Sequence, residues 1–166
     1  MIFKTNKHNN SLYNTLLLLS RNIFFYKNIG LKDIFETRIY LMFLHFSIIM
    51  IIFKKKGKKF NQDLYDLLFN YIENDLRELG FGDVSVNKKM KELNKILYDI
   101  LLKLQDNSEI DSFKVNKSLI CKYFKQFDMT KNGVYIEFET YLLNFFNFCF
   151  EKPIDNMLEE IIKFKN

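Results

Sequence analysis

The chain has 166 residues, a length that suits one domain with a substantial core and is short for two. Hydrophobic residues make up 48%, and 19 Phe beside five Gly and one Pro favour helices with short connections over many strands and turns. This composition excludes an intrinsically disordered chain, and two cysteines exclude a disulfide framework. The net charge of +5 favours anionic partners, such as nucleic acid, lipid headgroups or an acidic protein.

The amino terminus has neither the apolar run and cleavage site of a secretory signal nor the arginines of a transit peptide. We therefore expect a flexible segment over residues 1–10 and a single helical domain over residues 11–166. The expected location is the bacterial cytoplasm, peripheral to the inner face of the membrane, or the mitochondrial matrix side in a eukaryote. Cys121 and Cys149 lie among apolar residues like ordinary core thiols, which favours a reducing compartment.

Apolar residues recur every three or four positions from residue 11 onward, which predicts an all-α bundle of about six or seven helices with an aromatic-rich core. The first helix is expected over residues 11–26 and ends before Gly30. Asp33, with Glu36 three residues later, has the spacing of a capped helix start. We therefore expect Asp33 to cap the next helix.

The most apolar segment, residues 39–53, is shorter than the roughly 20 residues of a bilayer-spanning helix. A central buried helix is favoured, and a shallow membrane-contacting helix beside the lysines of residues 54–59 stays open as the alternative. His45 lies seven residues after Arg38 and so on nearly the same helical face. We expect the two to share a polar seam with Arg77 or a carboxylate.

Two further helices are predicted on either side of a corner, one over residues 60–79 and the other with an apolar stripe from Met90 to Leu104. Gly80 is expected to supply the left-handed residue that ends the first, and Asp83 or Ser85 to cap the second. The corner follows a helix, and it lacks the spacing of a dinucleotide fingerprint and the Lys-Ser/Thr of a P-loop, both of which follow a strand. It therefore looks like a helix corner and not a phosphate site.

Four lysines lie near the start of the second of these helices, where positive charge opposes the helix dipole. They are Lys88, Lys89, Lys91 and Lys95. This unfavourable placement indicates a reason outside the helix, such as an anionic partner. A purely structural corner and a partner-docking corner both stay open.

Arginine is rare in this lysine-rich chain. The three arginines are Arg21, Arg38 and Arg77. Because lysine cannot replace the planar fork of arginine in two-point pairing, these positions are singled out. Glu73 lies one turn before Arg77, and we expect the two to pair.

The segment after residue 104 begins with a polar loop, QDNSEIDS, and continues with two Phe-rich helices. Pro153 is expected to be the first residue of a short closing helix that ends near Lys163. Residues 128–139, DMTKNGVYIEFE, partly match a calcium-binding loop. Thr130 and Ile136 stand where oxygen ligands are usual, so a helix-loop-helix without metal is favoured.

Nothing in the sequence combines a nucleophile with a base. His8 lies near the terminus, His45 lies in an apolar run, and no serine has the flanking glycines of a nucleophile elbow. We therefore expect no catalysis, no cofactor, no metal and no small-molecule substrate. An enzyme that uses His45 and Arg38 would need both side chains to line an open cleft.

Two segments together resemble the ubiquinol-cytochrome c chaperone family, the assembly factors of respiratory complex III. In the first, features of the family's opening occur in the family's order, namely Phe25-Tyr26, Gly30, Asp33, Arg38 and Leu44-His45. The second, LRELGFGDVSVNKKMKELNKILY over residues 76–98, is similar to the family's most characteristic segment. Thr37 replaces a usual glycine, and Asp99-Ile100 replace a common Gly-Arg.

The resemblance implies an all-helical, non-enzymatic factor that holds newly made cytochrome b, or another complex III subunit, during membrane insertion and haem loading. It also implies peripheral membrane contact and, in mitochondria, contact with the ribosome and a small partner subunit. The alternative is a basic helical module that binds RNA, the ribosome or an anionic membrane surface without a cytochrome client. By position in the family's motifs, the expected partner-binding and turn-forming residues are Arg38, His45, Arg77, Gly80, Gly82, Asp83, Lys88 and Lys89.

Overall fold

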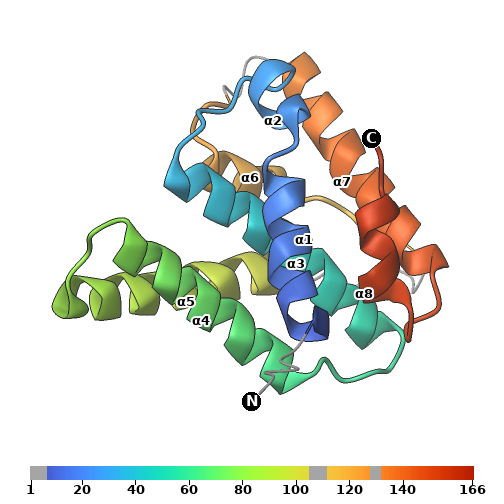
Figure 1. Cartoon of the computed structure of the whole chain (residues 1–166). Coiled ribbons are helices and arrows are strands. Elements are labelled where there is room, and N and C mark those ends of the chain that lie inside the picture. The colour runs from blue at the N-terminus through green and yellow to red at the C-terminus, as the bar shows by residue number, and fades with distance from the viewer. Residues whose placement is uncertain (1–6, 105–111, 128–131) are drawn as a thin grey trace.

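The computed structural model describes residues 7–104, 112–127 and 132–166, and within these ranges it contains helices and no strand (Figure 1). The predicted all-α bundle is confirmed, with seven α-helices followed by a short closing segment. The helices are α1 (Lys7–Ser20), α2 (Ile23–Lys27), α3 (Phe35–Lys55), α4 (Gln62–Glu78), α5 (Asp83–Leu104), α6 (Lys117–Tyr123) and α7 (Asn132–Glu151), and α8 (Met157–Glu160) with the 3-10 helix η1 (Ile161–Lys163) closes the chain. Of the predicted flexible terminus, residues 1–6 lie outside the described ranges, and α1 begins at Lys7.

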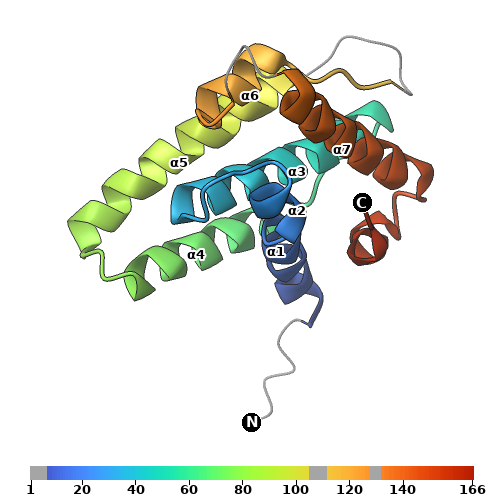
Figure 2. The same cartoon turned by 90° about the horizontal axis from the view of Figure 1, so that it is seen from above.

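Helix α3 is the centre of the bundle, in contact with α1, α5 and α7 (Figures 1 and 2). Thirteen of its 21 residues are buried, so the prediction of a central buried helix is confirmed. By length and composition α3 is apolar enough to cross a membrane, but 72% of its most apolar window is buried inside the described part of the bundle. The chain's own helices therefore cover most of the surface that a bilayer would otherwise cover.

Aromatic rings fill the space between α3 and its neighbours, as the composition predicts. Phe25 of α2 meets Phe138 and Tyr141 of α7 edge to face, with ring centroids 5.9 and 4.8 Å apart. Phe43 of α3 stacks on Phe69 of α4 at 5.9 Å. Each such pair contributes about 0.5–1.5 kcal/mol beyond the area that it buries. The rings thus connect helices that are distant in the sequence.

The segment predicted as one helix over residues 11–26 forms two. α1 ends at Ser20, and α2 begins at Ile23 after a break at Asn22. The side chain of Asn22 accepts a hydrogen bond from the backbone N–H of Phe24 at 3.0 Å, which starts a new helix. The chain therefore turns at Asn22, inside the segment that the apolar spacing predicts as one continuous helix.

Two predicted helix starts are wrong. α3 begins at Phe35 with no side-chain cap, because the carboxylate of Asp33 binds the side chain of Arg38 instead. Pro153 does not begin the closing helix either. Its carbonyl accepts from the N–H of Asn156 at 3.0 Å in a turn, and α8 starts at Met157.

Two lysines of the basic run at the end of α3 bind inside the molecule. Lys55 Nζ donates to the carbonyl of Ser112 at 2.8 Å, and Lys56 Nζ donates to that of Lys152 at 2.6 Å. Lys56 also lies 5.0 Å from the centre of the Phe150 ring, within range of a cation–π contact. This part of the basic run therefore fastens the end of α3 to the end of α7.

Asp99 fastens α6 to α5. Its carboxylate accepts from Lys103 at 2.7 Å, from Lys122 at 2.6 Å and from the hydroxyl of Tyr123. The hydrogen bonds from Lys103, Lys122 and Tyr123 hold the pKa of Asp99 well below its usual range. Asp99 is one of the residues that depart from the pattern of the family that the sequence resembles, and here it makes a link between two helices.

His45 is completely buried beside α7. Its Nδ1–H donates to the carbonyl of Leu41 at 2.6 Å, and its Nε2 accepts from the hydroxyl of Tyr141 at 2.8 Å. Burial lowers the pKa of His45 to about 4, because a charged imidazolium loses its hydration in the core. The side chain is therefore a neutral, fully bonded member of the core.

This burial predicts a dependence of stability on pH. In the unfolded chain histidine binds a proton near pH 6.5, whereas His45 in the fold does so only near 4. Its contribution is therefore fully present above pH 6.5 and falls as the pH is lowered toward 4. We expect the free energy of unfolding, measured with urea, to be about 2 kcal/mol lower at pH 5 than at pH 7.

The control for this prediction is His45→Gln, which lacks the titrating ring. The variant should be less stable at both pH values, because the Leu41 and Tyr141 contacts are disturbed, yet it should lose far less between them. A variant that loses as much as the parent chain would assign the effect to other groups.

Candidate functional site

A tight corner joins α4 to α5, and Gly80 makes it. Gly80 has φ of +93°, a backbone conformation that other residues rarely adopt. Its N–H donates to the carbonyl of Arg77 at 3.0 Å, and the N–H of Phe81 donates to that of Leu76 at 3.2 Å. These two bonds form a Schellman motif, so the sequence prediction for Gly80 is confirmed.

The start of α5 differs from the prediction. The helix begins at Asp83, so Asp83 and Ser85 both lie inside it and neither is its cap. The carboxylate of Asp83 instead binds the guanidinium of Arg77, which also binds Glu73 at 2.9 Å in the expected pair. Arg77 thus links the last turn of α4 to the first turn of α5, and Asp83 places negative charge at the positive end of the α5 dipole.

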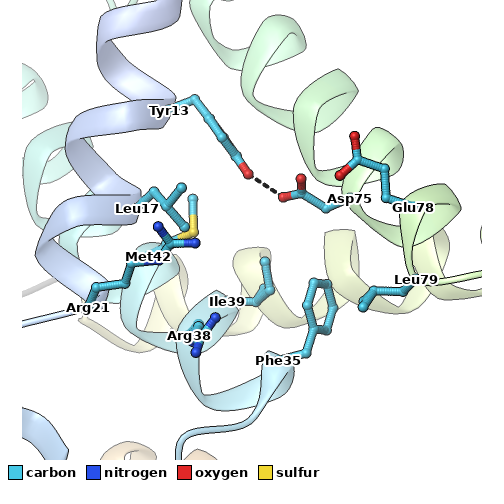
Figure 3. Close-up of a pocket in the computed structure, with 10 residues that line it drawn as sticks. All are labelled: Tyr13, Leu17, Arg21, Phe35, Arg38, Ile39, Met42, Asp75, Glu78 and Leu79. Carbon is cyan, nitrogen blue, oxygen red and sulfur yellow. Dashed lines mark hydrogen bonds between the residues drawn. The ribbon is translucent and has the colours of Figure 1, made fainter.

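A cleft of about 350 Å³ opens between α1, α3 and α4, close to this corner (Figure 3). Five apolar side chains line it. They are Leu17, Phe35, Ile39, Met42 and Leu79. The volume is at the lower end of the range for ligand pockets, so the cleft suits a few side chains or a small group.

Charged side chains stand on opposite walls of the cleft. Arg21, directly after α1, and Arg38 of α3 lie on one side, and Asp75 and Glu78 of α4 lie on the other (Figure 3). The hydroxyl of Tyr13 donates to Asp75. Burial, followed by this hydrogen bond and the charge of Asp75, raises the pKa of Tyr13, so the phenol stays protonated. The cleft is therefore positive on one wall and negative on the other.

These charges differ in how far the protein itself satisfies them. Arg38 donates to Asp33 through two nitrogens, at 2.7 and 2.6 Å, and Asp75 accepts from Tyr13. Arg21 and Glu78 form no ion pair within 4.0 Å across the ranges that the structure describes. Tyr13 is neutral and does not cancel the charge of Asp75, so the described walls offer one positive charge without an ion pair, Arg21, and two negative ones, Glu78 and Asp75.

A second, smaller hollow of about 30 Å³ lies between α3, α4 and α5, and Phe35 lines both openings. Leu79 lines the cleft and Phe81 lines the hollow, so the residues on the two sides of Gly80 belong to different openings. Leu79 is 58% exposed and Phe81 38%. The corner therefore displays apolar surface on both sides of Gly80.

The lysines of α5 are exposed or partly exposed. Lys88, Lys91 and Lys95 have no carboxylate within 4.0 Å among the residues that the structure covers. Lys89 lines the smaller hollow, with its Nζ 4.0 Å from Glu92, the outer limit of an ion pair. α5 begins at Asp83, so these lysines lie beyond the first turn in which the helix dipole acts, and the expected unfavourable placement is wrong. Lys88, Lys91 and Lys95 remain as exposed positive charges without an ion pair in the described ranges, which an anionic partner could use.

The structure places most of the predicted partner residues around the corner. Arg38 lines the cleft, Lys89 lines the hollow and Lys88 lies outside on α5. His45 is the exception, because its burial leaves no surface for a partner. The residues at the corner itself are Arg77, Gly80, Gly82 and Asp83.

The expected polar seam between Arg38 and His45 is wrong. Arg38 turns toward the cleft and binds Asp33, while His45 bonds Leu41 and Tyr141 in the core. His45 does not line the cleft, so the two do not share the open site that an enzyme built on them needs.

Sequence reasoning missed most of the charged side of the cleft. Arg21 carried a signal, since arginine is rare in this chain. Tyr13, Asp75 and Glu78 carried none, because their meeting depends on how α1 packs against α4.

Of the calcium-like segment, residues 128–131 lie outside the described ranges, and Asn132 onward is helical. In the described residues no three His, Cys, Asp or Glu side chains gather to hold a metal ion.

The chain is similar to a model of a known protein family. A model described as Ubiquinol-cytochrome C chaperone matches residues 27–131. The matched region runs from the end of α2 through α6 and contains the corner, the smaller hollow and most of the cleft. No curated protein and no solved structure matches the chain.

The two glycines of the corner give a matched test of its geometry. Gly80→Ala should lower the free energy of unfolding by about 1–2 kcal/mol, because alanine is strained at positive φ. Gly82→Ala should change it by less than about 1 kcal/mol, since Gly82 has no positive φ and nothing lies within 4 Å of an added Cβ. Urea unfolding measures both, and equal losses would contradict the assignment of Gly80 as the turn residue.

Proposed function

The chain belongs to the ubiquinol-cytochrome C chaperone family, and we propose that it holds newly made cytochrome b while this subunit is assembled into ubiquinol-cytochrome c reductase. A chaperone role follows from the family itself. The client and the complex are the steps that we add. They rest on the segments that resemble complex III assembly factors, of which LRELGFGDVSVNKKMKELNKILY forms the α4–α5 corner.

The observation that carries this proposal is the apolar surface displayed at the corner. Leu79 and Phe81 are exposed at the cleft and the hollow, next to the partly buried ring of Phe35. Burial of apolar surface contributes about 25 cal/mol per Å², so a client side chain that covers these residues gains affinity. An unassembled membrane subunit has such side chains in excess, because the bilayer does not yet cover them.

The proposed action is shielding without catalysis. The cleft and the hollow cover apolar client side chains until the bilayer or another subunit replaces them. We place the protein at the inner face of the membrane in this role, in support of which Lys88, Lys91 and Lys95 present positive charge that anionic headgroups attract. The buried helix α3 has no part in this contact.

Complementation tests the client. In cells of the source organism that lack the gene, we expect b-type cytochrome, measured by its absorption spectrum, and ubiquinol oxidation to fall. The wild-type gene should restore both. The variant Lys88→Glu with Lys89→Glu should restore them only in part, because the reversed charges repel an anionic partner.

A matched control is Lys58→Glu with Lys59→Glu, which makes the same charge change at exposed residues beyond the opposite end of α3. It should restore both measurements fully. Normal complex III in the deletion strain would overturn the proposed client. The Lys88 and Lys89 variant is informative only if it folds, which circular dichroism checks by its helical content.

A second candidate function is binding of RNA, at the ribosome or elsewhere, or of an anionic membrane without a cytochrome client. The observation that favours it is a stripe on the outer face of α5, where Lys88, Lys91, Lys95 and Tyr98 succeed one another at helical spacing. Tyr98 is 55% exposed, and an exposed ring beside lysines can stack on a base.

Salt dependence separates these possibilities. If RNA is the ligand, we expect binding of a short single-stranded RNA to weaken steeply between about 50 and about 200 mM salt, and Tyr98→Ala to weaken it further. Fluorescence anisotropy measures both. Binding to anionic vesicles that is unaffected by Tyr98→Ala, with no RNA binding, would assign the stripe to the membrane.

A further inference from the structure

The cleft has an apolar floor and charged walls, so a ligand that fills it needs both apolar and charged groups. Ile39 and Met42 at the floor are 2% and 1% exposed, so the floor is part of the core and accepts only apolar groups. Leu17, which is half-buried, continues this surface toward α1. A ligand that fills the cleft therefore brings an apolar side chain to its centre.

The walls exclude ligands that carry charge of only one sign. An acidic group is attracted to the wall of Arg21 and Arg38, and a second acidic group would face Glu78 and Asp75 across the cleft. In a ligand with two basic groups, one group is attracted to Glu78 and Asp75, and the other is repelled by Arg21. Like charges that face each other disfavour such partners, whereas opposite charges on the two walls favour a ligand with one charge of each sign.

The unpaired residues carry most of this selection. Arg38 is bound by Asp33, and Asp75 accepts the hydroxyl of Tyr13, whereas Arg21 and Glu78 are exposed and form no ion pair within the described ranges. A ligand therefore gains one ion pair on each wall without breaking a contact that the protein already makes.

We propose that the cleft binds a short polypeptide segment in which apolar side chains lie between an acidic residue at one end and a basic residue at the other. The inference rests on the proposed function, since it names the kind of client segment held there. A zwitterionic phospholipid has similar chemistry. A polypeptide is favoured because the exposed apolar surface continues past the cleft, through Leu79 to Phe81 at the hollow, where a chain that extends beyond the cleft finds further contacts.

Three synthetic peptides with the same apolar centre test this inference on the purified protein. They are acetyl-Asp-Leu-Phe-Leu-Lys-amide, the same peptide with Asp at both ends, and the same peptide with Lys at both ends. Isothermal titration calorimetry at low salt should show the mixed peptide binding about threefold to tenfold more tightly than either of the others, the effect of one or two partly exposed ion pairs.

Charge reversal should change the preference in a defined order. Arg21→Glu removes the unpaired positive charge and should favour the peptide with two lysines, whereas Glu78→Lys, which leaves Asp75 as the one acid on its wall, should raise the affinity for the peptide with two aspartates relative to the mixed peptide. The double variant restores one charge of each sign and should favour the mixed peptide again. Matched controls at exposed positions away from the cleft are Lys125→Glu and Glu137→Lys, which should leave the preference unchanged.

The inference is overturned if the wild-type protein binds the three peptides equally, or if Arg21→Glu and Glu78→Lys leave the preference unchanged. Displacement of the mixed peptide by phosphatidylethanolamine vesicles, with no such effect from phosphatidylglycerol vesicles, would overturn it in favour of a lipid site. These results are independent of complementation. Restored complex III in a strain that carries the double variant, together with equal peptide affinities, would remove this inference and leave the proposed function intact.

Discussion

The burial of α3 is the constraint on which the rest of the structure depends. Apolar side chains lie on nearly every side of this helix, so it is stable in water only when other helices surround it. α1, α5 and α7 supply this cover over most of its length. Over the first turns Phe35 is only partly covered, and the buried side chains of Ile39 and Met42 lie at the bottom of the cleft. The helix that organises the core therefore also supplies the apolar floor of the candidate site.

Several polar groups are bound within the fold, whereas others carry charge that the fold leaves available. His45 binds Leu41 and Tyr141, Asp99 holds two lysines, and Lys56 binds the end of α7. These groups have internal partners because an unpaired polar group near the core is costly. Arg21 and Glu78, by contrast, carry charge without an ion-pair partner among the described residues, and both lie at the cleft. Available charge and exposed apolar surface thus occur at the same place in the molecule.

Local signals in the sequence predicted what local physics decides. The apolar run predicted the buried helix, and Gly80 predicted the helix end, because both depend on neighbours in the chain. Predictions failed where a distant or competing partner decided the outcome. Asp33 and Asp83 are residues of a type that often caps helices. Each carboxylate instead binds a nearby guanidinium, because a hydrogen bond between two charged groups is stronger than one to a backbone N–H. The cleft was beyond sequence reasoning, since Tyr13 and Asp75 meet only when α1 packs on α4.

An assembly factor has to release its client as well as hold it, and the geometry of the corner favours release. The cleft has room for a few side chains, and the hollow for less, so the apolar area covered at any one moment is small. Exposed ion pairs at Arg21 and Glu78 would add about 0.2–1 kcal/mol each. Such contacts select a segment by its charges without binding it tightly. In the function that we propose, a bilayer or a partner subunit that covers more of the same apolar surface displaces the chaperone, because burial of apolar area scales with the surface removed from water.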